Sequence, residues 1–201
     1  NRGKSAIEKL KITERPNGQT VARVYPNNLL EKLILDNYYI DVWMKEGVTP
    51  NNIEETVASF YKLENPKGKV SLVLGAGNVS SIVPLDIFYK LYAKGEVVLI
   101  KMNPINEYLG PIFEKIFEPF IENGFIQFAY GDGDVGAFLT NHNLVDTIHI
   151  TGSARTHDAI VFGVGEDGQK RKNENRPVLN KPISSELGGV SPTIVVPGPW
   201  T

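Results

Sequence analysis

Cysteine is absent from all 201 residues of this chain. The absence excludes disulfide bridges, thiolate metal sites and a cysteine nucleophile within this sequence. The three histidines all lie within residues 142–157, and neither His142 nor His149 is paired with a cysteine or carboxylate at ligand spacing. We therefore predict no metal site.

A strong charge of one sign is also lacking, because the formal net charge is -2 at pH 7. Without a broad basic field, nucleic acid is not an expected partner. The short basic run at 170–172 lies among Gly, Asn and Gln, which is typical of a solvated loop. No apolar run approaches the roughly 20 residues of a membrane span, and no signal-peptide pattern opens the chain. We therefore expect a cytoplasmic protein without membrane contact.

The composition, with 41% hydrophobic and 22% charged residues, is that of a globular protein with one sizeable core. A turn signal, Asn-Pro-Lys-Gly at 65–68, divides the chain. Before it, residues 1–64 are expected to form a small mixed segment that packs on the core. The pattern there predicts strands at 19–25 and 41–44 and helices at 28–38 and 53–63.

Residues 65–201 alternate between apolar strands and amphipathic helices. This alternation predicts an α/β fold with a Rossmann-like, mostly parallel sheet and helices on both faces. The segment 164–181 is polar and is expected to be a surface excursion. The expected strands are 70–74, 97–100, 125–130, 147–150 and 191–197, and the expected helices are 82–92, 107–120, 135–141 and 154–162.

Glycine-rich or polar clusters follow the first four of these strands. They read GAGN at 75–78, KMNP at 101–104, GDGDVG at 131–136 and ITGS at 150–153. Ligands of parallel sheets bind at the carboxyl ends of the strands. The turn Thr151-Gly152-Ser153 precedes a helix, so its backbone N–H groups and the helix dipole could bind an anion. The alternative is an ordinary strand–helix connection.

The GDGDVG cluster has the form of a dinucleotide fingerprint, since it follows a strand and precedes a helix. The acidic residue expected about 20 positions later is missing, because Asp146 precedes the next strand rather than following it. The cluster alone therefore does not locate a phosphate site.

Taken together, the series GN, VVLIK, GxGxxG, IxITGS and ELGG-V-SP, spread over 66–197, resembles the aldehyde dehydrogenase superfamily. More narrowly, it resembles the cofactor-binding half of such an enzyme. The resemblance implies NAD or NADP as cofactor and a small aldehyde or acyl compound as substrate. It also implies a homo-oligomer.

The resemblance assigns roles residue by residue. Asn78 would stabilise an oxyanion, and Glu186 would activate the hydrolytic water. The alternatives are a helix-capping asparagine and a surface carboxylate. The cofactor would contact the adenosine-side residues Gly77, Lys101, Asn103, Gly133 and Gly136, the pyrophosphate turn Thr151, Gly152 and Ser153, and the nicotinamide-side residues Leu187 and Gly188.

Three positions depart from the family pattern. His157 replaces a second glycine of the pyrophosphate turn, either as a cationic partner or as an ordinary residue of the first helical turn. Pro104 stands where a ribose-binding carboxylate is common, so no carboxylate is expected beside Lys101 and NADP is compatible. Gly77 replaces an aromatic residue, as in acyl-group reductases of the superfamily. His142 and His149 are expected to be structural, because neither is paired with a carboxylate in the sequence.

The family's nucleophile is a cysteine downstream of the ELGG glutamate, and this chain has none. We therefore expect the chain alone to be inactive. The predicted function is NAD(P)-dependent aldehyde oxidation through a thiohemiacetal on a cysteine outside this sequence. The alternatives are an acyl-CoA or acyl-group reductase, and a non-catalytic nucleotide-binding module.

Overall fold

The structure is a computed structural model that describes residues 10–26, 28–35, 37–188 and 193–199. The chain divides into two compact units, Asn1–Glu64 and Asn65–Thr201. Over the described residues, no helix combines the length and the apolar character that a membrane crossing requires.

The first unit contains a three-stranded antiparallel sheet with the order β1-β2-β3. Its strands are β1 (Lys11–Glu14), β2 (Thr20–Tyr25) and β3 (Ile40–Trp43), accompanied by α1 (Leu29–Ile34), α2 (Ile53–Thr56) and the 3-10 helix η2 (Ser59–Lys62). β1 was not predicted. The helix expected at 53–63 is divided, because Ala58 adopts a left-handed conformation with φ 51°.

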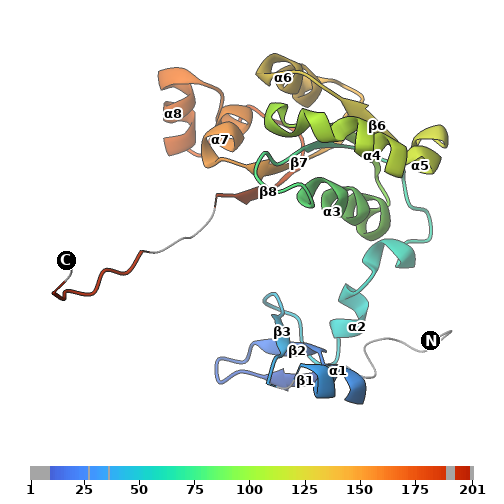
Figure 1. Cartoon of the computed structure of the whole chain (residues 1–201), viewed down its shortest axis with the longest axis vertical. Helices are drawn as coiled ribbons and strands as arrows, with labels where there is room; N and C mark the ends of the chain where they lie inside the picture. The colour runs from blue at the N-terminus through green and yellow to red at the C-terminus, as the bar shows by residue number, and fades with distance from the viewer. Residues whose placement is uncertain (1–9, 27, 36, 189–192, 200–201) are drawn as a thin grey trace. The chain divides into compact units, whose positions relative to one another are not determined.

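The second unit contains a five-stranded sheet with the order β6-β5-β4-β7-β8 (Figure 1). Every neighbouring pair in it is parallel, so the predicted α/β class is confirmed. The strands are β4 (Val70–Leu74), β5 (Val97–Lys101), β6 (Ile126–Ala129), β7 (Thr147–Gly152) and β8 (Ile183–Leu187).

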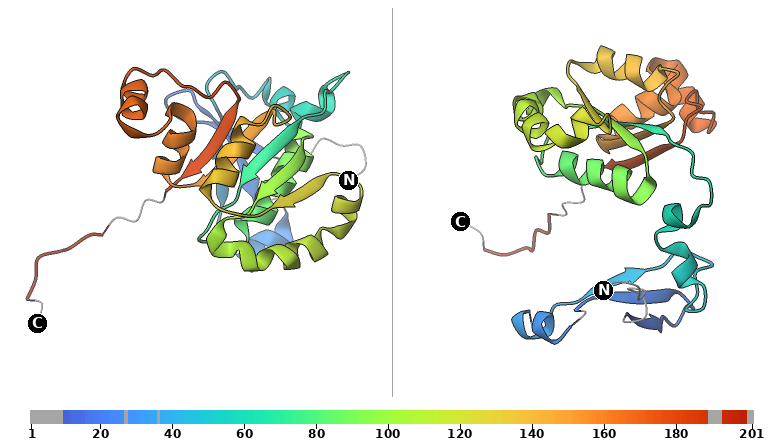
Figure 2. Two further views of the ribbon diagram at one scale, coloured as in Figure 1. Left: turned by 90° about the horizontal axis from the view of Figure 1, so that it is seen from above. Right: turned by 90° about the vertical axis from the view of Figure 1, so that its right-hand side faces the viewer.

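Helices cover both faces of this sheet (Figures 1 and 2). On one face, side chains of α3 (Ile82–Phe88) and α4 (Gly110–Ile116) bury Val73, Ile100 and Phe128 in the larger core. On the other face, α6 (Gly133–Asn141) packs on Leu72 and Ile148 in a smaller core. The remaining helices are η3 (Tyr89–Lys94), η4 (Pro104–Leu109), α5 (Glu118–Glu122), α7 (Ala154–Phe162) and α8 (Gly165–Asn173).

Three predicted elements differ from the structure. The helix expected at 107–120 is divided into η4, α4 and α5, each of which has a proline in its first turn. The excursion 164–181 contains α8, whose Glu166 and Asp167 at the start and basic residues at the end match the helix dipole. The final strand lies at 183–187 instead of 191–197, where the described residues 193–197 form none. Positions 191 and 192 lie outside the described residues.

Candidate active site

The carboxyl ends of all five strands of the second unit lie on the same edge of the sheet, because the strands are parallel. The chain winds outward from β4 to β6 and then returns to β7 on the other side of β4, so β4 and β7 flank a topological switch point. Most of the predicted site residues lie on or just after the strands at this edge: β4 (Gly77, Asn78), β5 (Lys101, Asn103), β7 (Thr151, Gly152, Ser153) and β8 (Glu186, Leu187, Gly188). Gly133 and Gly136 lie in the first two turns of α6, which follows β6.

The loop after β4 lies tightly against the end of β5. The Gly75 N–H donates to the carbonyl oxygen of Lys101 at 3.0 Å, and the buried side chain of Asn106 donates to the carbonyl oxygen of Ala76 at 3.1 Å. A Cβ atom added to Gly77 would lie 2.9 Å from Cγ of Asn103. A side chain at position 77 would therefore displace the side chain of Asn103.

Asn78 follows this loop and is exposed. Its amide makes no hydrogen bond to another residue that the structure describes. The N-cap of α3 is Ser81, so the alternative of a helix-capping role for Asn78 has no support in the geometry. The amide is free to donate to a ligand at the switch point.

Lys101 ends β5 and is only 6% exposed. Burial lowers the pKa of its ammonium group, while the carboxylates of Glu107 and Asp132 act in the opposite direction. Its ammonium makes no hydrogen bond within the described parts of the chain. A buried cation without such a partner is costly, so this position favours an incoming hydrogen-bond acceptor.

Glu107 and Asp132 were not predicted as site residues. The Gly131 N–H donates to Oε1 of Glu107 at 2.7 Å, and Asp132 caps α6 by accepting from the Asp134 N–H at 3.1 Å. Both carboxylates act on Lys101. Neither carboxylate forms an ion pair with this ammonium in the described chain, so the expectation that no carboxylate stands beside Lys101 stays a prediction, although other elements supply negative charge that Pro104 lacks.

The glycines of the GDGDVG cluster differ in their surroundings. Gly131 has a φ of 116°, and an added Cβ would lie 2.7 Å from Cγ2 of Val135. An added Cβ at Gly133 or Gly136 would meet no atom within 4 Å. The last two glycines are therefore not required by packing within the chain.

The end of β7 leads directly into α7. The strand extends through Thr151 and Gly152, so the predicted turn is reduced to Ser153. The Ser153 hydroxyl accepts from the Thr156 N–H at 3.1 Å and caps α7. α7 begins at Ala154 as predicted, and its N-terminus lies at the candidate site.

His157 lies in the first turn of α7, which agrees with the interpretation of it as an ordinary residue of the first helical turn. Its Nδ1 lies 3.2 Å from Oδ1 of Asp158, and Nζ of Lys172 lies 2.6 Å from the other oxygen of the same carboxylate. The hydrogen bond from Lys172 lowers the pKa of Asp158, and the His157 contact acts in the same direction. The imidazole is thus engaged by its neighbour in the helix.

Glu186 lies on β8 in register with Thr151 of β7. The pairing continues past the strand end, where the Gly188 N–H donates to the Gly152 carbonyl oxygen at 2.9 Å and Gly188 adopts φ 64°. Glu186 is exposed, and its carboxylate has no ion pair or hydrogen bond with any other described residue. It is therefore accessible to water and substrate.

His149 has a carboxylate partner that its spacing in the sequence does not reveal. Its Nε2 lies 3.4 Å from Oδ1 of Asp86. The sequence contained one signal of this pair, since Asp86 is the single charged residue in the apolar helix α3.

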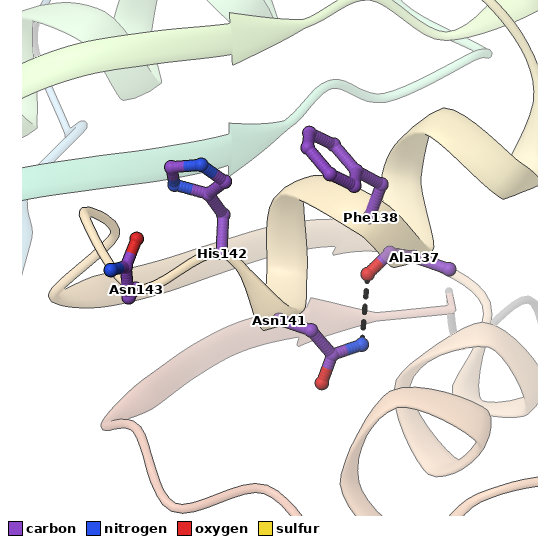
Figure 3. A pocket seen from close by; sticks show the side chains of 5 residues that line it. All are labelled: Ala137, Phe138, Asn141, His142 and Asn143. Atoms are coloured by element: carbon purple, nitrogen blue, oxygen red, sulfur yellow. Dashed lines mark hydrogen bonds between the residues drawn. The ribbon is translucent and has the colours of Figure 1, made fainter.

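The remaining histidine, His142, borders a surface hollow away from this edge (Figure 3). The hollow lies at the end of α6, where the ring centroids of Phe138 and His142 are 5.4 Å apart. Asn141 turns its amide back to the carbonyl oxygen of Ala137 at 2.8 Å. No carboxylate or ammonium lines this hollow, so it lacks the ionic groups found at the carboxyl ends of the strands.

Comparison with known proteins gives matches to one family. A profile described as "Aldehyde dehydrogenase family" matches residues 31–198. A betaine aldehyde dehydrogenase from Brucella ovis is 36% identical over 82 residues, which are 41% of this chain and 14% of that protein. The chain therefore spans only a small part of the length of that relative.

Two solved structures illustrate the structural likeness. A succinic semialdehyde dehydrogenase from Streptococcus pyogenes, in complex with NADP+, is 22% identical over 60% of this chain and 24% of its own, with a TM-score of 0.45. An NAD-dependent benzaldehyde dehydrogenase from Corynebacterium glutamicum is 24% identical over the same shares, with a TM-score of 0.44.

Proposed function

The chain belongs to the aldehyde dehydrogenase family, and from this premise we propose that it is the cofactor-binding part of an enzyme that oxidises a small aldehyde. The observation that carries the proposal is the convergence of Asn78, Lys101, Ser153 and Glu186 at one edge of the sheet, although they come from four different strands. A homo-oligomer and a cytoplasmic location stay predictions.

The proposed cofactor is NAD+ or NADP+, which accepts a hydride when bound. Three features of this chain fit a dinucleotide. The buried ammonium of Lys101 has no hydrogen-bond acceptor among the described residues, so it is available to donate to a ribose hydroxyl. The N-terminus of α7 at Ser153 offers backbone N–H groups to a pyrophosphate. Gly77 leaves room for the side chain of Asn103 at the carboxyl end of β5.

Two residues are proposed to serve the chemistry. The nucleophile would be a cysteine outside these 201 residues, whose attack on the aldehyde gives a thiohemiacetal. The Asn78 amide would donate to its oxyanion. After the carbon has been oxidised to a thioester, Glu186 would take a proton from water as that water attacks. The acid is released and the thiol is restored.

Two alternatives have specific support. Gly77 before Asn78 is the feature shared with acyl-group reductases, which would run the chemistry from a thioester to an aldehyde without using water. His157 replaces a glycine of the family's pyrophosphate turn, and its imidazole contacts the carboxylate of Asp158. A non-catalytic nucleotide-binding module would tolerate this change.

Cofactor binding by the 201-residue chain tests the proposal. Calorimetric titration should show saturable binding of NAD+ or NADP+. The substitution Lys101→Met should weaken it about 10- to 100-fold, because a hydrogen bond to a charged group contributes about 1.5 to 3 kcal/mol. The matched control is Lys115→Met on α4, which removes an exposed lysine from the same unit.

Lys101→Met should also make the unliganded chain more stable. Because burial lowers the pKa of Lys101, the folded state disfavours its charged form, and stability rises with pH between the lowered value and the ordinary lysine value. Methionine should remove that dependence. Absence of binding by the wild-type chain, or binding unchanged in Lys101→Met, would contradict the proposed cofactor site.

The choice between the two nucleotides should depend on Glu107. Its carboxylate acts on Lys101 and would repel a 2′-phosphate placed there. Glu107→Gln keeps an oxygen for the Gly131 N–H and should raise the affinity for NADP+ several-fold while NAD+ changes little. Dissociation constants for both nucleotides should be measured at one salt concentration. An equal change for both would show that Glu107 does not face the 2′ position.

A further inference from the structure

We propose that Asp86, His149 and Thr151 form a positioning network that holds strand β8, and with it the carboxylate of Glu186, in place. The inference rests on the proposed role of Glu186 as the base in aldehyde oxidation. Asp86 and His149 are assigned to neither substrate nor cofactor, and Thr151 is also a predicted residue of the pyrophosphate turn.

The imidazole of His149 links three elements of the second unit. It is 6% exposed. Its Nε2 lies 3.4 Å from Oδ1 of Asp86 on α3, and its Nδ1 lies 2.8 Å from Oγ of Ser184 on β8. Both ring nitrogens of a buried histidine on β7 are thus used for contacts to other elements.

Thr151 extends this network toward Glu186. Its Oγ1 lies 3.4 Å from Oδ2 of Asp86 and 3.4 Å from Nε2 of His149. The register pairs His149 with Ser184 and Thr151 with Glu186. Side chains two residues apart on a strand share a face, so Glu186 stands beside Thr151, one pair beyond the bridge from His149 to Ser184.

β8 has little else to fix its position on this face. It pairs only with β7, and all its residues after Ile183 are exposed in the described chain. The central strand β4, by contrast, has three buried residues and a neighbour on each side. The parallel ladder with β7 holds the backbone of β8. Because apolar burial adds little to that ladder, we infer that the contact between His149 and Ser184 supplements it on this face.

A second polar contact on β7 provides a matched control. Thr147 lies two residues before His149 and donates to Oε2 of Glu96 at 3.0 Å. The same carboxylate lies 3.3 Å from Nζ of Lys90. Thr147 is as buried as His149, at 7% exposed, but its register partner is Ser71 on β4 and none is on β8.

Amide hydrogen exchange of the 201-residue chain tests the placement of β8. His149→Phe keeps a ring but removes both contacts, and should speed exchange in residues 183–187 roughly five- to tenfold. His149→Gln, which can still donate to Asp86, should restore part of the protection. Thr147→Val should leave β8 at the wild-type rate. Asp86→Asn serves as a second variant if the phenylalanine protein does not fold.

Kinetics of the protein as the cell produces it test the link to Glu186. His149→Phe should lower the steady-state rate of aldehyde oxidation about tenfold, since small displacements of a catalytic group are costly. The first-turnover burst of reduced cofactor and the KM for the cofactor should stay at wild-type values. A general structural defect would reduce the burst as well.

The outcomes separate this inference from the proposed function. A wild-type protein that neither binds NAD(P)+ nor oxidises aldehydes overturns the proposed function and the catalytic part of this inference with it. An active wild type in which His149→Phe changes neither β8 exchange nor turnover overturns the network alone. An equal loss of burst and turnover also overturns it, because the effect would not be specific to hydrolysis.

Discussion

Replacing Glu186 by glutamine is expected to slow steady-state aldehyde oxidation by about 10²- to 10⁴-fold, the usual contribution of a general base. Glutamine has the shape of glutamate but cannot take a proton from the attacking water. Because hydride removal precedes hydrolysis, the first turnover should still release one equivalent of reduced cofactor. The protein should then accumulate as a thioester, which stopped-flow absorbance and intact-mass measurement would detect.

Glu186→Gln is expected to leave the stability of the fold unchanged. Glu186 is exposed and has no described ion pair whose loss could destabilise the fold. The matched control is Glu122→Gln, because Glu122 is an exposed carboxylate on α5 of the same unit. Turnover in the control should equal that of the wild type.

The same variant separates the two enzymatic alternatives. Reduction of an acyl thioester to an aldehyde uses no water, so an acyl-group reductase should be insensitive to Glu186→Gln. The acyl-group reductase would be favoured if Glu186→Gln reduces the thioester as fast as the wild type does and the wild type oxidises no aldehyde. Undiminished aldehyde oxidation in the variant would show that another group activates the water.

The first four strands of the second unit were predictable from short runs of apolar residues, whereas β8, with the more polar sequence ISSEL, was not. Val70–Leu74 forms β4 with the predicted bounds, since both of its faces are buried and its sequence is apolar apart from Ser71. The positions of the glycine and hydroxyl clusters at strand ends followed from the same alternation. The general location of the candidate site was therefore readable in the sequence.

Contacts between distant residues were not predictable in the same way. Asp86 and His149 are 63 positions apart in the sequence and meet only because α3 packs on β7. The carboxylates of Glu107, in η4 after β5, and Asp132, after β6, act on the charge of Lys101 from segments that follow two different strands. Periodicity places each residue on an element, but packing decides which charges face one another.

Replacing Gly168 by alanine is expected to destabilise the second unit by about 2 to 4 kcal/mol. Gly168 is buried in α8, and an added Cβ would lie 2.2 Å from the carbonyl oxygen of Gly163 and 2.6 Å from its carbonyl carbon. A backbone carbonyl cannot rotate away as a side chain can. The helix would have to move from the end of α7, where the Arg171 Nε–H donates to the Phe162 carbonyl oxygen at 2.6 Å.

Gly136→Ala is the matched control, because Gly136 lies within α6 and an added Cβ would meet no atom within 4 Å. Alanine there should stabilise the unit by about 0.5 to 1 kcal/mol, since glycine loses more backbone freedom in a helix. Urea unfolding curves of both variants measure the two effects. If Gly168→Ala unfolds at the wild-type midpoint, α8 does not pack on the end of α7. If Gly136→Ala is stable but fails to bind the nucleotide, the open side of Gly136 is where the cofactor approaches the backbone.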